Sequence, residues 1–179
     1  MTFKTKDLTI IAMCTALIAI CSWISIPTAV PFTLQTFAVF LTILLIGGKR
    51  GTISVFIYII LGAIGVPVFA NFTGGIGILL GNTGGYIIGF LVSALIMWAI
   101  MHLFGEKPLI QIISMVVGLF VCYTFGTAWF MILYLKSTGA VSLITVLSWC
   151  VIPYIIPDII KILLAFVLAS RLKKHNKLI

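Results

Sequence analysis

Charged residues are scarce in this sequence. Only 8% of its 179 residues are Asp, Glu, Lys or Arg, and just three of them are acidic. A soluble domain keeps roughly a quarter of its residues charged, so a chain that is 63% hydrophobic is not expected to form one. The charges lie in short clusters between apolar stretches long enough to cross a bilayer, which takes roughly 20 helical residues. We therefore predict one all-α integral membrane domain over residues 1–179.

The residue types that carry catalysis are also few. Two histidines and three acids supply neither a nucleophile with its base nor a metal-binding cluster. The four cysteines lie singly within apolar stretches and lack metal-ligand spacing. The sequence contains no Gly-x4-Gly-Lys-Ser/Thr phosphate loop. We therefore predict no catalytic residue, no metal, no cofactor and no hydrolysis of ATP by this chain.

Six transmembrane helices fit the apolar pattern best. An even number places both termini on one side, and that side then collects nine of the eleven Lys and Arg residues. The other side holds only Lys136, and Lys161 falls within the last span. Such a bias predicts that both termini are cytoplasmic. It also argues against nucleic-acid binding, which needs a basic face on a folded surface. The predicted spans are 8–26, 32–47, 52–66, 86–104, 109–134 and 142–171.

A glycine-rich segment, 65–86, lies between the third and fourth predicted spans. It is apolar enough for membrane depth, yet its glycines and Pro67 make a poor helix. An irregular backbone at that depth is tolerated where protein covers it or where it lines a cavity. We expect an outer loop that lines or covers a binding site; an ordinary connection is the alternative. The earlier outer stretch, 27–35, is also uncharged and adds Thr33 and Gln35 on the same side.

Asp158 and Lys161 are the ionisable residues that fall well inside a predicted span. Their spacing of three places both on one helix face, within reach of each other. Pro153 and Pro157 lie just before them and predict a kinked or opened helix. Two readings stay open: a neutralised structural pair, or a ligand site in which the carboxylate accepts and the ammonium donates hydrogen bonds.

Four stretches, taken together and in this order, resemble the biotin-binding S component of energy-coupling factor transporters. They are VPFTLQT at 30–36, LGAIGVPVF at 61–69, GNTGGY at 81–86 and PDIIK at 157–161. The resemblance implies six helices in a prokaryotic plasma membrane and high-affinity capture of biotin from outside. It also implies partners: a transmembrane coupling subunit and two cytoplasmic ATPases.

The resemblance also assigns roles to residues. Ala12 and Ala16, a small-xxx-small pair that lets another helix approach closely, fall where such S components meet the coupling subunit. The ureido ring of biotin offers two N–H donors and one carbonyl acceptor, and its thioether ring and aliphatic chain need apolar walls. The residues expected to bind it are Asp158, Lys161, Thr73, Asn71, Gln35, Thr33, Gly74, Gly75 and Tyr86.

A stand-alone secondary transporter of a small, partly polar solute is the alternative function. Such a protein would couple transport to protons or sodium. A single intramembrane carboxylate makes a weak proton relay, and no inverted repeat is visible in the sequence. Counterflow without ATPase partners would distinguish the two functions.

Overall fold

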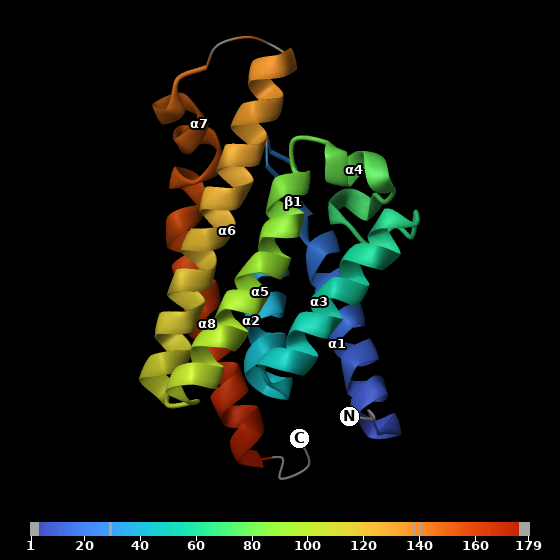
Figure 1. The fold of residues 1–179 in the computed structure, drawn as a ribbon, viewed down its shortest axis with the longest axis vertical. Coiled ribbons are helices and arrows are strands. Elements are labelled where there is room, and N and C mark those ends of the chain that lie inside the picture. The colour runs from blue at the N-terminus through green and yellow to red at the C-terminus, as the bar shows by residue number, and fades with distance from the viewer. Residues whose placement is uncertain (1–3, 29, 138, 140, 176–179) are drawn as a thin grey trace.

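The computed structural model describes residues 4–28, 30–137, 139 and 141–175. These residues are almost entirely helical, as the sequence predicts. Two short strands and one 3-10 turn complete the described part (Figure 1). In chain order the elements are α1 (Thr5–Trp23), β1 (Ser25–Ile26), β2 (Phe32–Thr33), α2 (Gln35–Ile46), α3 (Gly48–Ala63), η1 (Ala70–Phe72), α4 (Ile76–Leu80), α5 (Gly84–Phe104), α6 (Pro108–Ser137), α7 (Leu143–Cys150) and α8 (Ile152–His175).

Four helices, α1, α5, α6 and α8, are individually long and apolar enough to cross a membrane. Helix α2 has 12 residues and α3 has 16, which correspond to lengths of roughly 18 and 24 Å at about 1.5 Å per residue. Both fall short of a hydrocarbon layer of about 30 Å. The prediction of an all-α membrane protein is therefore supported, while the crossing of all six predicted spans stays a prediction.

Helix α2 forms the centre of the bundle. Its Ala38, Val39 and Ile43 are fully buried, and it packs against α1, α3, α5 and α8. Neighbouring helices, rather than lipid, therefore surround most of α2, and a helix covered by protein does not itself have to match the bilayer thickness. The outside of the bundle carries exposed large apolar side chains, among them Phe120 and Ile144, as expected of a surface that faces lipid.

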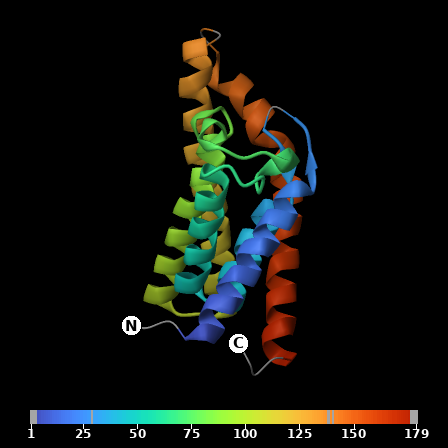
Figure 2. The same ribbon diagram turned by 90° about the vertical axis from the view of Figure 1, so that its right-hand side faces the viewer.

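Both ends of the described chain lie at one end of the bundle, together with the α2–α3 and α5–α6 turns (Figures 1 and 2). Ion pairs between described residues occur there: Arg50 lies 2.8 Å from Asp7, and Lys173 lies 3.2 Å from Glu106. The basic residues assigned to one side by the sequence thus gather at this end, except Lys177, which lies outside the described residues. Helix α4, the C-terminal end of α6 and the start of α7 lie at the opposite end (Figure 1).

The first predicted span, 8–26, ends earlier than expected. Helix α1 stops at Trp23, and the next residues form β1, which pairs antiparallel with β2. Ser25 lies opposite Thr33 in this pair. The β1–β2 pairing fixes where α2 starts. It therefore places Gln35, the first residue of α2, beside the cavity described below.

The last predicted span, 142–171, is two helices rather than one. Val151, with φ −128° and ψ −56°, leaves helical geometry and separates α7 from α8. Pro153 falls in the first turn of α8, where its missing N–H removes no intrahelical bond. Pro157 lies inside α8. The break aims α7 away from the axis of α8 (Figure 2).

Candidate functional site

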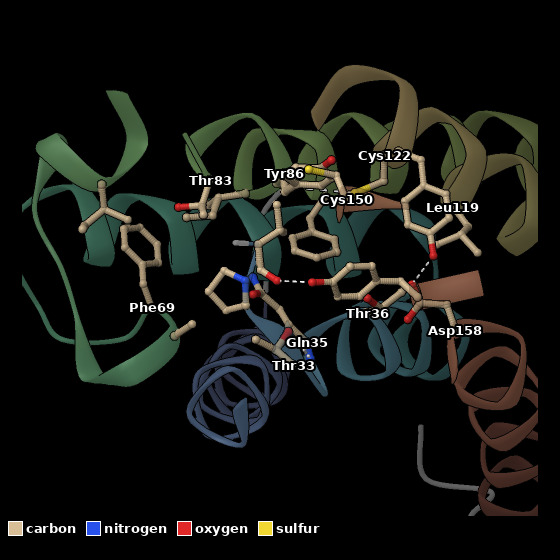
Figure 3. A pocket seen from close by; sticks show the side chains of 18 of the residues that line it. Thr33, Gln35, Thr36, Phe69, Thr83, Tyr86, Leu119, Cys122, Cys150 and Asp158 are labelled. Atoms are coloured by element: carbon tan, nitrogen blue, oxygen red, sulfur yellow. Dashed lines mark hydrogen bonds between the residues drawn. The ribbon is translucent and has the colours of Figure 1, made fainter. Parts of the chain in front are cut away.

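A cavity of about 230 Å³ lies beneath the glycine-rich segment. Its walls come from β2, α2, η1, α4, α5, α6, α7 and α8, so residues far apart in the sequence meet around it. Figure 3 shows Asp158 near one end and Phe69 and Thr83 at the other. Phe90 and Leu119 contribute to the mainly apolar lining between the ends. The cavity has the character of a small-molecule site: apolar walls with a few placed polar groups.

Asp158 and Lys161 form the charged end of this cavity. The Lys161 ammonium lies 2.8 Å from Asp158 Oδ1 and donates a second hydrogen bond, of 2.7 Å, to the backbone carbonyl of Thr33. It also lies 4.1 Å from the centroid of the Phe32 ring. The other carboxylate oxygen, Asp158 Oδ2, accepts a 2.5 Å hydrogen bond from the Tyr123 hydroxyl.

The pair combines features of both readings left open by the sequence. As whole residues, Asp158 is 3% and Lys161 is 5% exposed, and the two neutralise each other as a structural pair would. They also line the cavity, as a ligand site would. Each carboxylate oxygen has a second lone pair beyond the one used by the protein. Asp158 therefore keeps acceptor capacity for a ligand N–H while its charge remains compensated.

Gln35 brings an unpaired donor to the same cavity. The side chain is only 4% exposed, and its Nε2 has no hydrogen-bond partner within the described part of the chain. The backbone N–H of Gln35 donates to Thr33 Oγ1 at 3.2 Å, which holds the residue at the start of α2. A buried donor without a partner costs about 1–3 kcal/mol. An oxygen of a bound ligand would remove this cost.

Two further tyrosines line the walls. The Tyr154 hydroxyl donates to the carbonyl of Val30 and lies 2.8 Å from Thr28 Oγ1, so it fastens the β1–β2 connection to α8. The Tyr86 hydroxyl lies 3.0 Å from Thr127 Oγ1 and joins α5 to α6. Tyr86 therefore presents its ring to the cavity, and its hydroxyl already has a protein partner.

The glycine-rich segment is fastened over the cavity by two indole donors. Trp23 Nε1 donates to the carbonyl of Pro67 at 2.8 Å, and Trp129 Nε1 donates to the carbonyl of Gly81 at 3.1 Å. These bonds satisfy carbonyls that an irregular backbone leaves unpaired. The segment thus covers the cavity as a fixed cap, which agrees with the expectation of a loop that lines a site.

Asn71 and Thr73 line the cavity from the cap. Asn71 adopts the left-handed conformation, with φ 57°, and its Oδ1 accepts a 3.0 Å bond from the Ser25 hydroxyl. Gly74 and Gly75 do not line the cavity. Gly74 packs closely on the backbone of Gly65 and Val66, and Gly75 has φ 99°. Both glycines therefore shape the cap instead of facing a ligand.

The structure therefore brings together seven of the nine residues predicted to bind ligand: Thr33, Gln35, Asn71, Thr73, Tyr86, Asp158 and Lys161. Ala12 and Ala16 lie elsewhere, both exposed on α1. Sequence reasoning missed Tyr123 and Tyr154. A tyrosine on an apolar helix carries no sequence signal that separates a site residue from a packing or interfacial one.

Comparison with known proteins shows close relatives. Residues 1–177 match the BioY family. The Biotin transporter BioY of Thermotoga maritima is 40% identical over 164 residues, which cover 89% of this chain and 91% of the relative. The Probable biotin transporter BioY of Pyrococcus horikoshii is 37% identical over 174 residues, covering 97% and 99%. A crystal structure of the S-component for biotin from an ECF-type ABC transporter superposes with a TM-score of 0.81 at 29% identity, covering 97% of this chain and 95% of that one. The chain is a multi-pass membrane protein that belongs to the BioY family.

Proposed function

We propose that this chain is the biotin-binding S component of an energy-coupling factor transporter. The observation that carries the proposal is the capped cavity, apolar along its walls and closed at one end by a buried Asp158–Lys161 pair. Membership of a family whose relatives are named biotin transporters supports the choice of ligand.

The chemistry of biotin fits the two kinds of wall. The ureido N–H groups bind at the charged end, where Asp158 is the acceptor. Lys161 and the unpaired amide of Gln35 are the donors for the ureido carbonyl. The thioether ring and valeryl chain lie along the apolar middle, and the carboxylate lies toward the cap, near Asn71 and Thr73. Thr33 supports the site through its backbone carbonyl, which holds Lys161.

The end of the bundle that carries both termini faces the cytoplasm, and the cap faces outward. Nine of the eleven Lys and Arg residues lie on the terminal side in the six-span topology, in keeping with the positive-inside rule. Six segments, namely α1, α2, α3, α5, α6 and the α7–α8 pair counted as one, then cross the plasma membrane of a prokaryote. Biotin enters the cavity from the outer side.

Energy for transport comes from partner subunits. The sequence lacks a phosphate-binding loop, so a transmembrane coupling subunit and two cytoplasmic ATPases supply ATP hydrolysis. The exposed Ala12 and Ala16 on α1 form the flat strip against which a helix of the coupling subunit packs.

Uptake into proteoliposomes tests this function against a secondary transporter. Labelled biotin should accumulate only when the coupling subunit, both ATPases and ATP accompany the chain. Accumulation of labelled biotin by the chain alone, driven by a proton or sodium gradient, would refute the ATP-driven proposal and support the secondary transporter.

A further inference from the structure

Tyr123 contacts the charged end of the cavity from a different helix. Tyr123 lies on α6, and its hydroxyl donates to Asp158 Oδ2 at 2.5 Å (dashed line at Asp158 in Figure 3). Lys161, on α8, donates to Asp158 Oδ1 at 2.8 Å. The two donors grip the carboxylate at its two oxygens. A carboxylate held at both oxygens from two helices cannot turn about its Cβ–Cγ bond without breaking a charge-assisted hydrogen bond.

The ring of Tyr123 has a second neighbour. It lines the cavity on one side, and on the other it borders an apolar groove of about 390 Å³ between α6 and α7, which Phe120, Leu143 and Val151 also line. The ring is thus part of the wall between the cavity and the groove, and its hydroxyl makes the hydrogen bond to Asp158. A phenylalanine at this position would keep the ring in the wall and lose only the hydrogen bond to Asp158.

We infer that Tyr123 is a positioning residue that fixes the Asp158 carboxylate for recognition of ligand N–H groups. Without the Tyr123 hydroxyl, the carboxylate is free to turn both oxygens toward the Lys161 ammonium. That arrangement strengthens the ion pair but withdraws acceptor lone pairs from the cavity. Tyr123 therefore contributes to ligand selectivity through Asp158, and this inference rests on the proposed binding of biotin.

A double-mutant cycle measures this coupling. Calorimetric titration with biotin compares the parent, Tyr123→Phe, Asp158→Asn and the double variant, with Tyr134→Phe as the control on the same helix. Tyr134 stacks on Phe130 and does not line the cavity. Tyr123→Phe should weaken biotin binding on the order of 10- to 100-fold, as expected for a hydrogen bond to a charged group. In the Asp158→Asn background the same change should weaken it less than about 3-fold.

The selectivity between two ligands distinguishes a positioning role from a purely structural one, because a structural role would affect the binding of both ligands equally. Tyr123→Phe should weaken biotin more than a biotin analogue whose ureido nitrogen is methylated, because that analogue already lacks one N–H. Equal losses for both ligands, or losses that add in the double variant, would overturn the inference.

Infrared spectroscopy tests the contact without any ligand. The difference spectrum between parent and Asp158→Asn isolates the carboxylate stretch of Asp158, and Tyr123→Phe should shift that band. An unshifted band would overturn the inference even if biotin binds tightly. If the parent does not bind biotin but the band shifts, biotin is refuted as the ligand, while the positioning of Asp158 by Tyr123 is supported.

Discussion

Replacing Lys161 with methionine removes the ammonium that neutralises Asp158 and keeps an unbranched side chain in its place. The parent ammonium has two strong acceptors, Asp158 Oδ1 and the carbonyl of Thr33. Among the described residues, the Lys161→Met variant leaves the buried Asp158 carboxylate with only the Tyr123 hydroxyl as its donor. The variant Lys161→Met/Asp158→Asn removes both charges and keeps a polar group for Tyr123.

The magnitude follows from the burial of the pair. The side chains of Lys161 and Asp158 are 6% and 4% exposed, so solvent screening does not reduce their interaction as it would at a surface. Removing one partner of a buried ion pair typically destabilises by about 3–5 kcal/mol, whereas replacing both costs far less. At about 2–4 °C per kcal/mol for a chain of this size, Lys161→Met should lower the apparent Tm by roughly 6–20 °C.

Thermal unfolding in detergent, followed by tryptophan fluorescence without ligand, measures this effect. The double variant should unfold at a higher temperature than Lys161→Met, even though it carries one more substitution. An unchanged Tm for Lys161→Met would refute the reasoning. So would a double variant less stable than Lys161→Met, since the two charges would then not be coupled.

Three further changes test other parts of the molecule. Trp129→Phe removes the hydrogen bond to the Gly81 carbonyl and should weaken the attachment of the cap by about 1 kcal/mol. Bound labelled biotin should then dissociate roughly 5-fold faster in a chase experiment. An unchanged dissociation rate would show that this bond does not hold the cap. Gly84→Ala places a methyl group against the backbone of Leu79, whereas the methyl group of Gly77→Ala points into open space. Only Gly84→Ala should therefore markedly lower the Tm. Equal effects of the two substitutions on the Tm would contradict this packing. Ala16→Trp should leave biotin binding intact and abolish co-purification with the coupling subunit; retained co-purification would move the interface elsewhere on the chain.

The charged end of the site was predictable because charge inside a membrane is costly. Asp158 and Lys161 stand out from an apolar helix, and a spacing of three predicts the contact that the structure shows at 2.8 Å. The glycine-rich cap was predictable for a related reason: its backbone needs partners outside a helix. In both cases a local pattern breaks a strong physical rule.

The tyrosines of the site were not predictable in this way. Tyr123 and Tyr154 each lie on an apolar helix, and the partners of their hydroxyls are set by how α6 and α8 pack. Gly74 and Gly75 illustrate the converse, since a glycine in a binding loop either faces the ligand or shapes the backbone. The structure places these two in the second group.

Helix ends were the least predictable part of the fold. Pro153 signals a break in the last span, but the non-helical residue is Val151, two positions earlier. A proline is well accommodated in the first turn of a helix, so α8 begins at Ile152, just before Pro153, and the break falls at Val151. Likewise, Ile24 and Ile26 prolong the apolar run beyond Trp23, yet α1 ends there because Ser25 and Ile26 pair with β2. Pro27, four residues after Trp23, could not have continued the helix.

Calorimetric titration of the purified, detergent-solubilised chain with biotin tests the central claim most directly. We expect tight binding by the parent and clearly weaker binding by Asp158→Asn and by Lys161→Ala. Binding that survives both changes would reduce the pair to a structural role. A correctly folded parent that does not bind biotin would contradict the proposed function.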